Sequence, residues 1–263
     1  MTMEFTRDNV GMSGMGRRGR RVPKTSELIA RWIRRDAIDR RLQPGAILPT
    51  ETELREQFEV SRPTLREALR ILESQQLVRI GRGATGGARY TLPLAGMVAQ
   101  HTGIYLEAHR TTQRDLTEAR LNVEPCVIGF IAERSSGRAL DALRESVAAH
   151  RAAAHDIVRF AHEHEHFYEL LADLCPNRTL GLFLLILRQI MGAQAELLGD
   201  SVVPHGKNSA AALMAHVRAK EKLVRFIENR DREGAETLWR RHLNAQLKQL
   251  VESGRGDLPI STN

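Results

Sequence analysis

The stretch "LPTETELREQFEVSRPTLREALRILESQQLVRIGRGATGGARYTL", residues 48–92, decides how the first third of the chain folds. Thr50 and Glu53 stand at the spacing of a capping box, which predicts a short helix that runs through Phe58. Ser61 caps a second helix after a tight connection. Two helices joined so closely are typical of a helix-turn-helix.

The second helix of this pair has two different faces. Its apolar residues recur at helical spacing and are predicted to pack inward, namely Leu65, Ala68, Leu69 and Leu72. Its remaining surface presents Arg62, Thr64, Arg66 and Arg70. A recognition helix that reads duplex DNA typically has hydrogen-bond donors to phosphates and base edges on one side and packing residues on the other.

A further helix precedes this pair and a hairpin follows it. Apolar residues from Thr25 to about Arg41 form a helical stripe, which "LQPG" ends. The segments "LVRI" and "ARYTL" alternate as strands do around the turn "GRGATGG", so they predict a two-stranded wing with Arg82 at its tip. The whole segment predicts a winged helix-turn-helix.

The net charge of the chain lies entirely in this first third. Residues 1–91 hold 18 Lys and Arg against 11 Asp and Glu, whereas residues 92–263 hold 21 of each. A basic module joined to a neutral one indicates a polyanion partner for the basic part and a different task for the other. No apolar run reaches the length of a membrane span, and two cysteines cannot form a disulfide framework. We expect a cytoplasmic protein without a membrane partner.

The motif "LxPGxxLPTExEL…FxVSRPTLREALRxLExxxLV" resembles the GntR family of bacterial transcription regulators, across residues 24–91. The resemblance implies a homodimer on double-stranded operator DNA, with the start of the recognition helix in the major groove and the wing tip in the minor groove. By motif position it adds Ser61, Arg82 and Gly83 to the candidate DNA contacts, beside Arg62, Thr64, Arg66 and Arg70.

Residues 92–263 are predicted to be almost wholly helical, in an antiparallel bundle of about six to seven helices. The predicted helices are 95–109, 113–134, 136–153, 156–174, 178–197, 209–229 and 231–252. The helix with "LGLFLLIL" is apolar nearly all round, so we expect it at the bundle centre. "EARLNVEPCVIGFIAERS" and "RFIENRDREGAETLWRRHL" resemble the two ends of the FCD effector domain of FadR-type regulators.

The expected organisation is mostly α-helical and has five parts. These are a flexible basic arm (1–23), the winged helix-turn-helix domain (24–91), a linker with the first bundle helix (92–111), a helical effector and dimerisation domain (112–253) and a flexible tail (254–263).

Many FCD domains hold a divalent metal through an Asp, a His four residues later and two further His. The matching positions here are His164, Tyr168, Lys220 and His242. An ammonium group at a ligand position repels a cation, so we favour no metal and no cofactor. Lys220 suits an anion instead, and we expect a small carboxylate effector, with a fatty acid or acyl-CoA favoured from the FadR resemblance.

Other interpretations of these residues stay open. His216 lies on the same stripe as Lys220, so a rearranged metal set of His164, His216 and His242 is one alternative. Arg120 either lines the effector pocket or pairs with Glu124 four residues later. A third alternative is an internal polar network that binds no ligand.

An HExxH match provides an alternative from a different class. His162, Glu163 and His166 have the spacing of zinc metalloproteases, which would make the chain a metal-dependent hydrolase. His164, between Phe160 and Phe167 on the apolar stripe, is predicted to point inward, so the HExxH residues lie on the polar face. A solvated face is a poor place for catalytic zinc. We therefore predict a metabolite-responsive repressor and not an enzyme, with an architectural DNA-binding protein as the remaining alternative.

Overall fold

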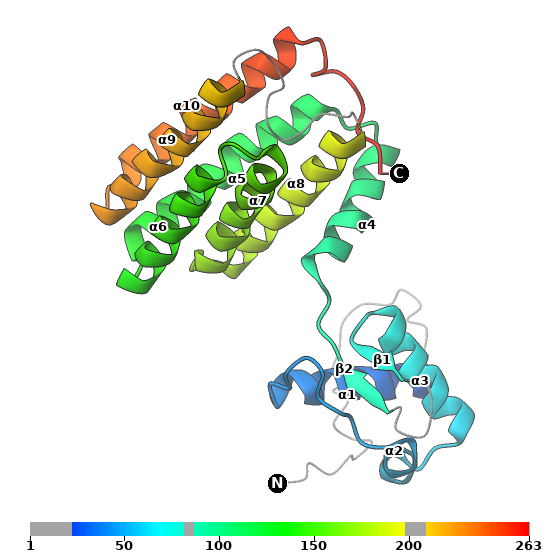
Figure 1. The fold of residues 1–263 in the computed structure, drawn as a ribbon. Coiled ribbons are helices and arrows are strands. Elements are labelled where there is room, and N and C mark those ends of the chain that lie inside the picture. Colours follow the sequence, from blue (N-terminus) through cyan, green and yellow to red (C-terminus); the bar gives the residue numbers. More distant parts are fainter. Residues whose placement is uncertain (1–22, 82–86, 198–208, 263) are drawn as a thin grey trace, which may run out of the picture. The chain divides into compact units, whose positions relative to one another are not determined.

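The computed structural model describes residues 23–81, 87–197 and 209–262 (Figure 1). The chain forms two compact units, which meet in the sequence between Pro93 and Leu94. Each unit has a hydrophobic core of its own. The arm predicted over residues 1–23 lies, except for its last residue, outside the described ranges. None of the helices within those ranges has the length and apolar character needed to cross a membrane.

The described part of the N-terminal unit consists of helices and a small antiparallel hairpin. Its elements are α1 (Thr25–Asp39), α2 (Glu51–Phe58), α3 (Arg62–Ser74), β1 (Val78–Ile80) and β2 (Ala88–Tyr90). The strands pair with Val78 opposite Tyr90 and Ile80 opposite Ala88. The predicted winged helix-turn-helix is therefore confirmed.

Local hydrogen bonds explain the sharp turn between α2 and α3. The Glu53 amide donates to Thr50 Oγ1 at 3.2 Å, and the Thr50 amide donates to the Glu53 carboxylate at 2.7 Å, which completes the predicted capping box. Glu59 ends α2 with φ of 50°, a left-handed conformation that reverses the chain within one residue. Ser61 then accepts a hydrogen bond from the Thr64 amide and starts α3.

The core of the N-terminal unit fixes the direction of α3. Leu65 and Leu69 are buried and pack with Ile29 of α1 in one apolar cluster. Trp32 of α1 meets Phe58 of α2 edge to face, with ring centroids 5.1 Å apart. Because these residues occupy one side of α3, its other side is left for solvent or a partner.

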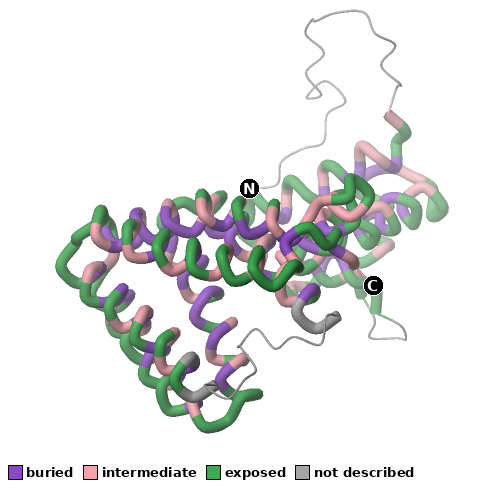
Figure 2. Tube along the Cα trace, turned by 90° about the horizontal axis from the view of Figure 1, so that it is seen from above, coloured by how far each residue is buried: buried purple, intermediate pink, exposed green. Residues whose placement is uncertain are grey.

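The C-terminal unit is a bundle whose described helices match the predicted ranges to within one residue at each end. They are α4 (Ala95–Ala108), α5 (Gln113–Arg134), α6 (Gly137–Ala152), α7 (Ile157–Leu174), α8 (Arg178–Leu197), α9 (Ser209–Glu228) and α10 (Arg232–Glu252). Figure 2 shows buried positions recurring along the helices, as expected for amphipathic helices that share one core. The fold prediction is confirmed.

The centre of the bundle is α5, and the expectation that the "LGLFLLIL" helix lies there is wrong. Helix α5 packs against α7, α8, α9 and α10. Helix α8 packs against α4, α5 and α7 but leaves Leu182 and Phe183 exposed by 38% and 47%. Composition alone misplaced α8, because an apolar helix can also keep part of its apolar surface at the periphery.

The segment predicted as a flexible tail, residues 254–263, is packed against the bundle over its described part. The Ile260 side chain is buried, and its amide donates to the Thr111 carbonyl at 2.9 Å. The Thr262 hydroxyl and amide donate to Glu107 of α4. Sequence periodicity could not reveal this segment, because its described residues form no helix or strand of their own and bury a single apolar side chain. It ties the end of α4 to the bundle.

Candidate functional site

The exposed face of α3 presents the arginines that the sequence selects as DNA contacts. The side chains of Arg62, Arg66 and Arg70 are exposed by 62%, 53% and 74%, whereas Leu65 on the opposite face is fully buried. The three guanidinium groups are therefore exposed where a duplex can reach them. Their role in binding DNA stays a prediction.

Glu51 of α2 contacts two of these arginines and was not singled out from the sequence. Its Oε2 atom lies 3.5 Å from Arg62 Nε and 3.6 Å from Arg66 Nε. Ion pairs this exposed are weak, so a phosphate can replace the carboxylate at little cost. The capping box at Thr50 places Glu51 in the first turn of α2, and this turn was the available signal.

Of the other predicted DNA contacts, the structure describes those at the start of α3 but not those at the wing tip. Ser61 Oγ and Thr64 Oγ1 lie 2.8 Å apart and are hydrogen-bonded to each other at the start of α3. The free amides of this helix start favour an anion such as a phosphate. Arg82 and Gly83 at the wing tip lie outside the described residues.

The residues predicted to bind an effector come together inside the helical unit. They are contributed by α5 (Arg120), α7 (His164 and Tyr168), α9 (His216 and Lys220) and α10 (His242). The ring of His164 lies 5.2 Å from that of Tyr168 and 5.8 Å from that of His216, which is 5.2 Å from that of His242. We call this group, with His150 and Arg188 described below, the polar cluster.

Two members of the polar cluster were missed by sequence reasoning. His150 of α6 is fully buried, and its Nδ1 atom lies 3.0 Å from Lys220 Nζ. Arg188 of α8 places its guanidinium carbon 4.0 Å from the centre of the Tyr168 ring and forms an ion pair with Glu165. Both occupy inward positions of apolar stripes, and a polar residue on such a stripe was the signal that could have found them.

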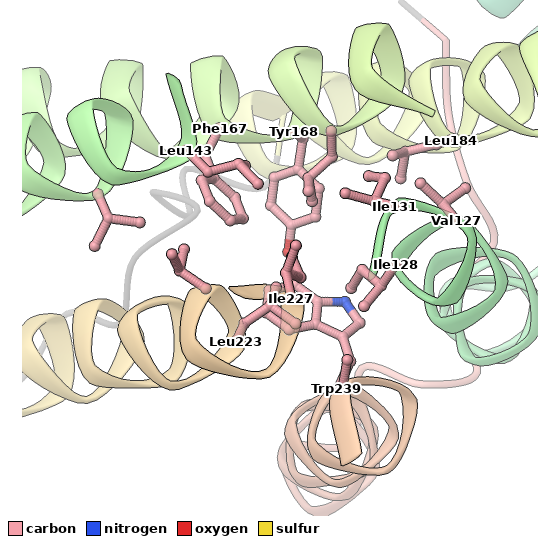
Figure 3. Packing of buried hydrophobic residues seen from close by; sticks show 14 of the residues in the cluster. Val127, Ile128, Ile131, Leu143, Phe167, Tyr168, Leu184, Leu223, Ile227 and Trp239 are labelled. Atoms are coloured by element: carbon pink, nitrogen blue, oxygen red, sulfur yellow. The ribbon is translucent and has the colours of Figure 1, made fainter. Parts of the chain in front are cut away.

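A second set of contacts fixes Arg120. Its Nε atom lies 2.5 Å from Glu124 Oε1, and the other oxygen of Glu124 accepts from the Trp239 indole at 2.7 Å. Arg120 also donates to Gln246, which is hydrogen-bonded to His242. Arg120 thus forms the ion pair with Glu124 that the sequence suggested. It also belongs to the polar cluster, through Gln246 and His242. Figure 3 shows Tyr168 and Trp239 pointing toward each other across the interior.

Several buried polar atoms of the cluster have no hydrogen-bond partner among the described residues. They are Arg120 Nη2, His150 Nε2, His164 Nδ1, Tyr168 Oη, Arg188 Nε and His216 Nδ1. An unmatched buried donor or acceptor costs about 1–3 kcal/mol. So many such atoms in one place are typical of a site that is completed by a polar ligand or by water.

Burial controls the protonation of this cluster. Burial, and next the charge of Lys220, lowers the pKa of His150 to about 3 and that of His216 to about 4. Burial also lowers the pKa of Lys220 well below its usual value, helped by the nearby Arg188. The Tyr168 pKa is raised to about 12, first by burial and then by Glu124. The histidines and Tyr168 are therefore neutral at pH 7.

The cluster does not fit the metal found in many FCD domains. Of the four ligand positions, those of Tyr168 and Lys220 have lost the ligand type. Within residues 23–81, 87–197 and 209–262, no three His, Cys, Asp or Glu side chains are placed to hold a metal ion, and this includes the alternative set with His216. His162 and His166 of the HExxH match lie exposed on α7, away from the buried cluster.

A winged helix-turn-helix followed by a helical domain with a buried polar cluster defines a class of proteins, the DNA-binding transcription regulators with an effector domain. Comparison with protein families agrees. The model described as "Bacterial regulatory proteins, gntR family" matches residues 25–85, and that of the FCD domain matches residues 115–245. The chain belongs to the GntR family and has a C-terminal FCD domain. It is a transcription regulator and not an enzyme.

Individual relatives are similar over most of their length. The HTH-type transcriptional repressor NanR of Cronobacter sakazakii is 26% identical over 246 residues, covering 92% of this chain and 91% of that protein. NanR of Escherichia coli K12 is 24% identical over 226 residues, covering 84% and 82%. A solved GntR structure from Streptococcus agalactiae has a TM-score of 0.65 at 20% identity, covering 85% of this chain and 99% of that one, and it supports the fold.

Proposed function

We propose that this chain is a metabolite-responsive repressor that acts as a homodimer in the cytoplasm. In this proposal a small carboxylate binds in the polar cluster and changes the affinity for operator DNA. The similarity to proteins named as repressors supports the direction of control. An exposed apolar stripe on α4, with Val98 and Tyr105 exposed by 39% and 62%, supports association with a second copy.

The observation that best supports an anionic effector is the charge balance of the polar cluster. Arg120 pairs with Glu124, and Arg188 pairs with Glu165. Among the described residues no carboxylate lies within ion-pair distance of Lys220, which is 2% exposed. The cluster is therefore balanced either with a neutral Lys220 or with one bound negative charge. A carboxylate would supply that charge and accept hydrogen bonds from the unmatched donors.

The chemistry of the cluster favours a short, hydrophilic acid over the acyl chain favoured from the sequence. Six polar atoms around Lys220 lack partners. The neighbouring apolar space is filled by the side chains of Phe167, Leu223, Ile227 and Trp239, all fully buried (Figure 3). A fatty acyl group would have to displace this packed core.

On DNA, the proposal assigns α3 two kinds of contact. Arg62 is expected to read base edges, so Arg62→Ala should reduce discrimination between operator and altered sites by about 1–3 kcal/mol. A phosphate-contacting arginine, which we expect Arg66 to be, should instead weaken binding to all sequences alike. Arg35→Ala on α1, exposed by 85%, provides a matched control of equal charge change. Fluorescence anisotropy against operator and scrambled duplexes measures both quantities.

The effector part is tested with the full-length protein and a labelled duplex from its own upstream region. Operator affinity is measured with lactate, succinate, butyrate and a long-chain acyl-CoA, for the natural protein, Lys220→Met and Lys222→Met. Lys222 is exposed on the same helix and serves as the control. We expect a short acid to change affinity in the natural protein and the control but not in Lys220→Met.

Each other result changes the conclusion. A response only to the acyl-CoA would restore the long-chain ligand. A response that survives in Lys220→Met would overturn the role of Lys220. DNA binding that no acid alters, with little preference for sequence, would favour the architectural alternative.

A further inference from the structure

Lys220 has surroundings that are unusual for a lysine. Its Nζ atom lies 3.0 Å from His150 Nδ1 and 4.3 Å from the centre of the Phe167 ring. The charged groups that act on it from other helices are the Arg188 guanidinium and the carboxylates of Glu165, Glu163 and Glu124. This lysine is buried, and among the described residues no carboxylate is within ion-pair distance of it, because Glu124 pairs with Arg120 and Glu165 pairs with Arg188.

Such surroundings change what a lysine can do. A lysine amine becomes a nucleophile when it is desolvated in an apolar site or placed beside another cation, because both conditions favour the uncharged form. Lys220 is desolvated between His150 and the Phe167 ring, and burial, helped by Arg188, lowers its pKa even though Glu165, Glu163 and Glu124 act in the opposite direction. The neutral His150 ring can accept a hydrogen bond from Nζ, which orients the nitrogen lone pair away from His150 and toward the rest of the cluster.

We propose that Lys220 forms a reversible Schiff base with an effector that carries a carbonyl next to its carboxylate, that is, a 2-oxo acid. This inference rests on the proposed function and narrows its ligand class. The carboxylate of such an acid is one bond from the carbonyl carbon, so an acid held at the cluster brings that carbon to Nζ. The unmatched donors of Arg120, Tyr168 and Arg188 suit the carboxylate.

The reaction balances without an oxidant, a reductant or a metal. The Nζ atom attacks the carbonyl carbon, and one amine proton moves to the carbonyl oxygen to give a carbinolamine. The carbon–oxygen bond then breaks, and the hydroxyl leaves as water with the second amine proton. The product is a carbon–nitrogen double bond to Lys220, and addition of water reverses every step. The neutral side chains of His150 and Tyr168 can relay these protons.

Reduction with sodium borohydride makes the adduct permanent and therefore measurable. The full-length protein is incubated with pyruvate or glyoxylate, treated with borohydride and measured by intact mass, and the modified residue is located by peptide mapping. Lactate and glycolate are the matched controls, since they keep the carboxylate but have a hydroxyl in place of the carbonyl. The chain has only five lysines, Lys24, Lys207, Lys220, Lys222 and Lys248, so mapping is unambiguous.

We expect one adduct per chain, with Lys220 modified on the order of tenfold more than the exposed Lys222. Lys222→Arg should keep this adduct and Lys220→Arg should lose it. Mapping of the natural protein gives the answer even if Lys220→Arg does not fold. Equal modification of all lysines, or no adduct at all, would overturn the inference.

The two proposals fail in different ways. If lactate and pyruvate alter operator affinity equally and borohydride traps nothing, the Schiff base is wrong and the carboxylate effector stands. If borohydride traps Lys220 but operator affinity does not change, the Schiff base stands and the effector role is wrong. If neither acid binds in either assay, both are rejected for this class of acid.

Discussion

The buried histidines of the polar cluster make the stability of the helical unit depend on pH. Burial is the main cause of their lowered pKa values, about 3 for His150 and about 4 for His216 and His242. In the unfolded chain a histidine has a pKa near 6.5. Between these values the unfolded chain binds more protons at the histidines than the folded one, so their contribution to stability is full above about pH 7 and is lost as the pH is lowered toward 4.

The size of the effect follows from these pKa values. At pH 5, a histidine with a folded pKa of about 4 and an unfolded pKa of about 6.5 costs about 2 kcal/mol of stability. His150 contributes a similar amount. Partial exposure of His216 and His242 reduces their share. We expect these three histidines together to cost roughly 3–6 kcal/mol between pH 7.5 and pH 5, which is much of the stability of an ordinary domain. His164 adds to the loss, because burial lowers its pKa well below 6.5 as well.

The composition of the chain provides a clean assay. All ten histidines follow Pro93, so the N-terminal unit has none, and each unit contains one tryptophan, Trp32 and Trp239. In the variant Trp32→Phe, fluorescence reports only on the buried Trp239 of the helical unit. Urea unfolding of this variant at pH 7.5 and pH 5 gives the two free energies of unfolding.

Two histidine variants test the cause. His150→Asn in the Trp32→Phe background keeps a hydrogen-bond acceptor for Lys220. It should reduce the difference in the free energy of unfolding between pH 7.5 and pH 5 by about 2 kcal/mol. His162→Asn, on the exposed face of α7, is the matched control and should leave it unchanged. If the free energy of unfolding differs by less than about 1 kcal/mol between the two pH values, or if both variants behave alike, the histidines are not held neutral by burial.

Three further changes probe the helical unit. Glu124→Gln leaves a buried guanidinium without its counter-ion and should lower the free energy of unfolding by about 3–5 kcal/mol, as measured by urea unfolding. Lys220→Met should raise the free energy of unfolding by roughly 1–4 kcal/mol, because an apolar side chain replaces a buried amine that has no ion-pair partner among the described residues. A lower free energy of unfolding would contradict this. Deleting residues 255–263 should speed amide exchange in α4, measured by mass spectrometry, and leave α9 unchanged.

The sequence predicted the elements well, because their signals are local. The capping pairs at Thr50 and Ser61 and the apolar stripe of α3 each depend on residues within one or two turns. The same is true of the bundle helices, where amphipathic periodicity fixed the ends to within one residue. Local signals do not determine which helix packs against a given helix face. For this reason the prediction that α8 lies at the centre of the bundle is wrong.

The candidate site was only half predictable for the same reason. Lys220 and Tyr168 were found from family positions, but His150 joins them from a helix 70 residues earlier in the chain. Arg188 was hidden in an apolar run, although an arginine that is 4% exposed needs partners from other helices. The packed tail was missed since its contact with Glu107 spans 155 residues.

These long-range contacts also indicate how an effector could influence the rest of the chain. Helix α8 places Arg188 over Tyr168 in the polar cluster. Six residues further along the same helix, Gln194 accepts a hydrogen bond from the Ser261 amide of the tail, and the tail binds Glu107 of α4. A rigid helix thus connects the cluster to α4, the element that directly follows the DNA-binding unit in the chain.

This connection sets a condition on any effector. A ligand shifts an equilibrium only by the difference between its affinities for the two states, so contact with a group that does not move cannot produce a response. Lys220 lies on α9, which has no contact with the tail among the interactions described above. An acid that touches only Lys220 would therefore bind without altering operator affinity. An effector must also engage Arg188, which is part of α8, or Tyr168, whose ring lies against the Arg188 guanidinium.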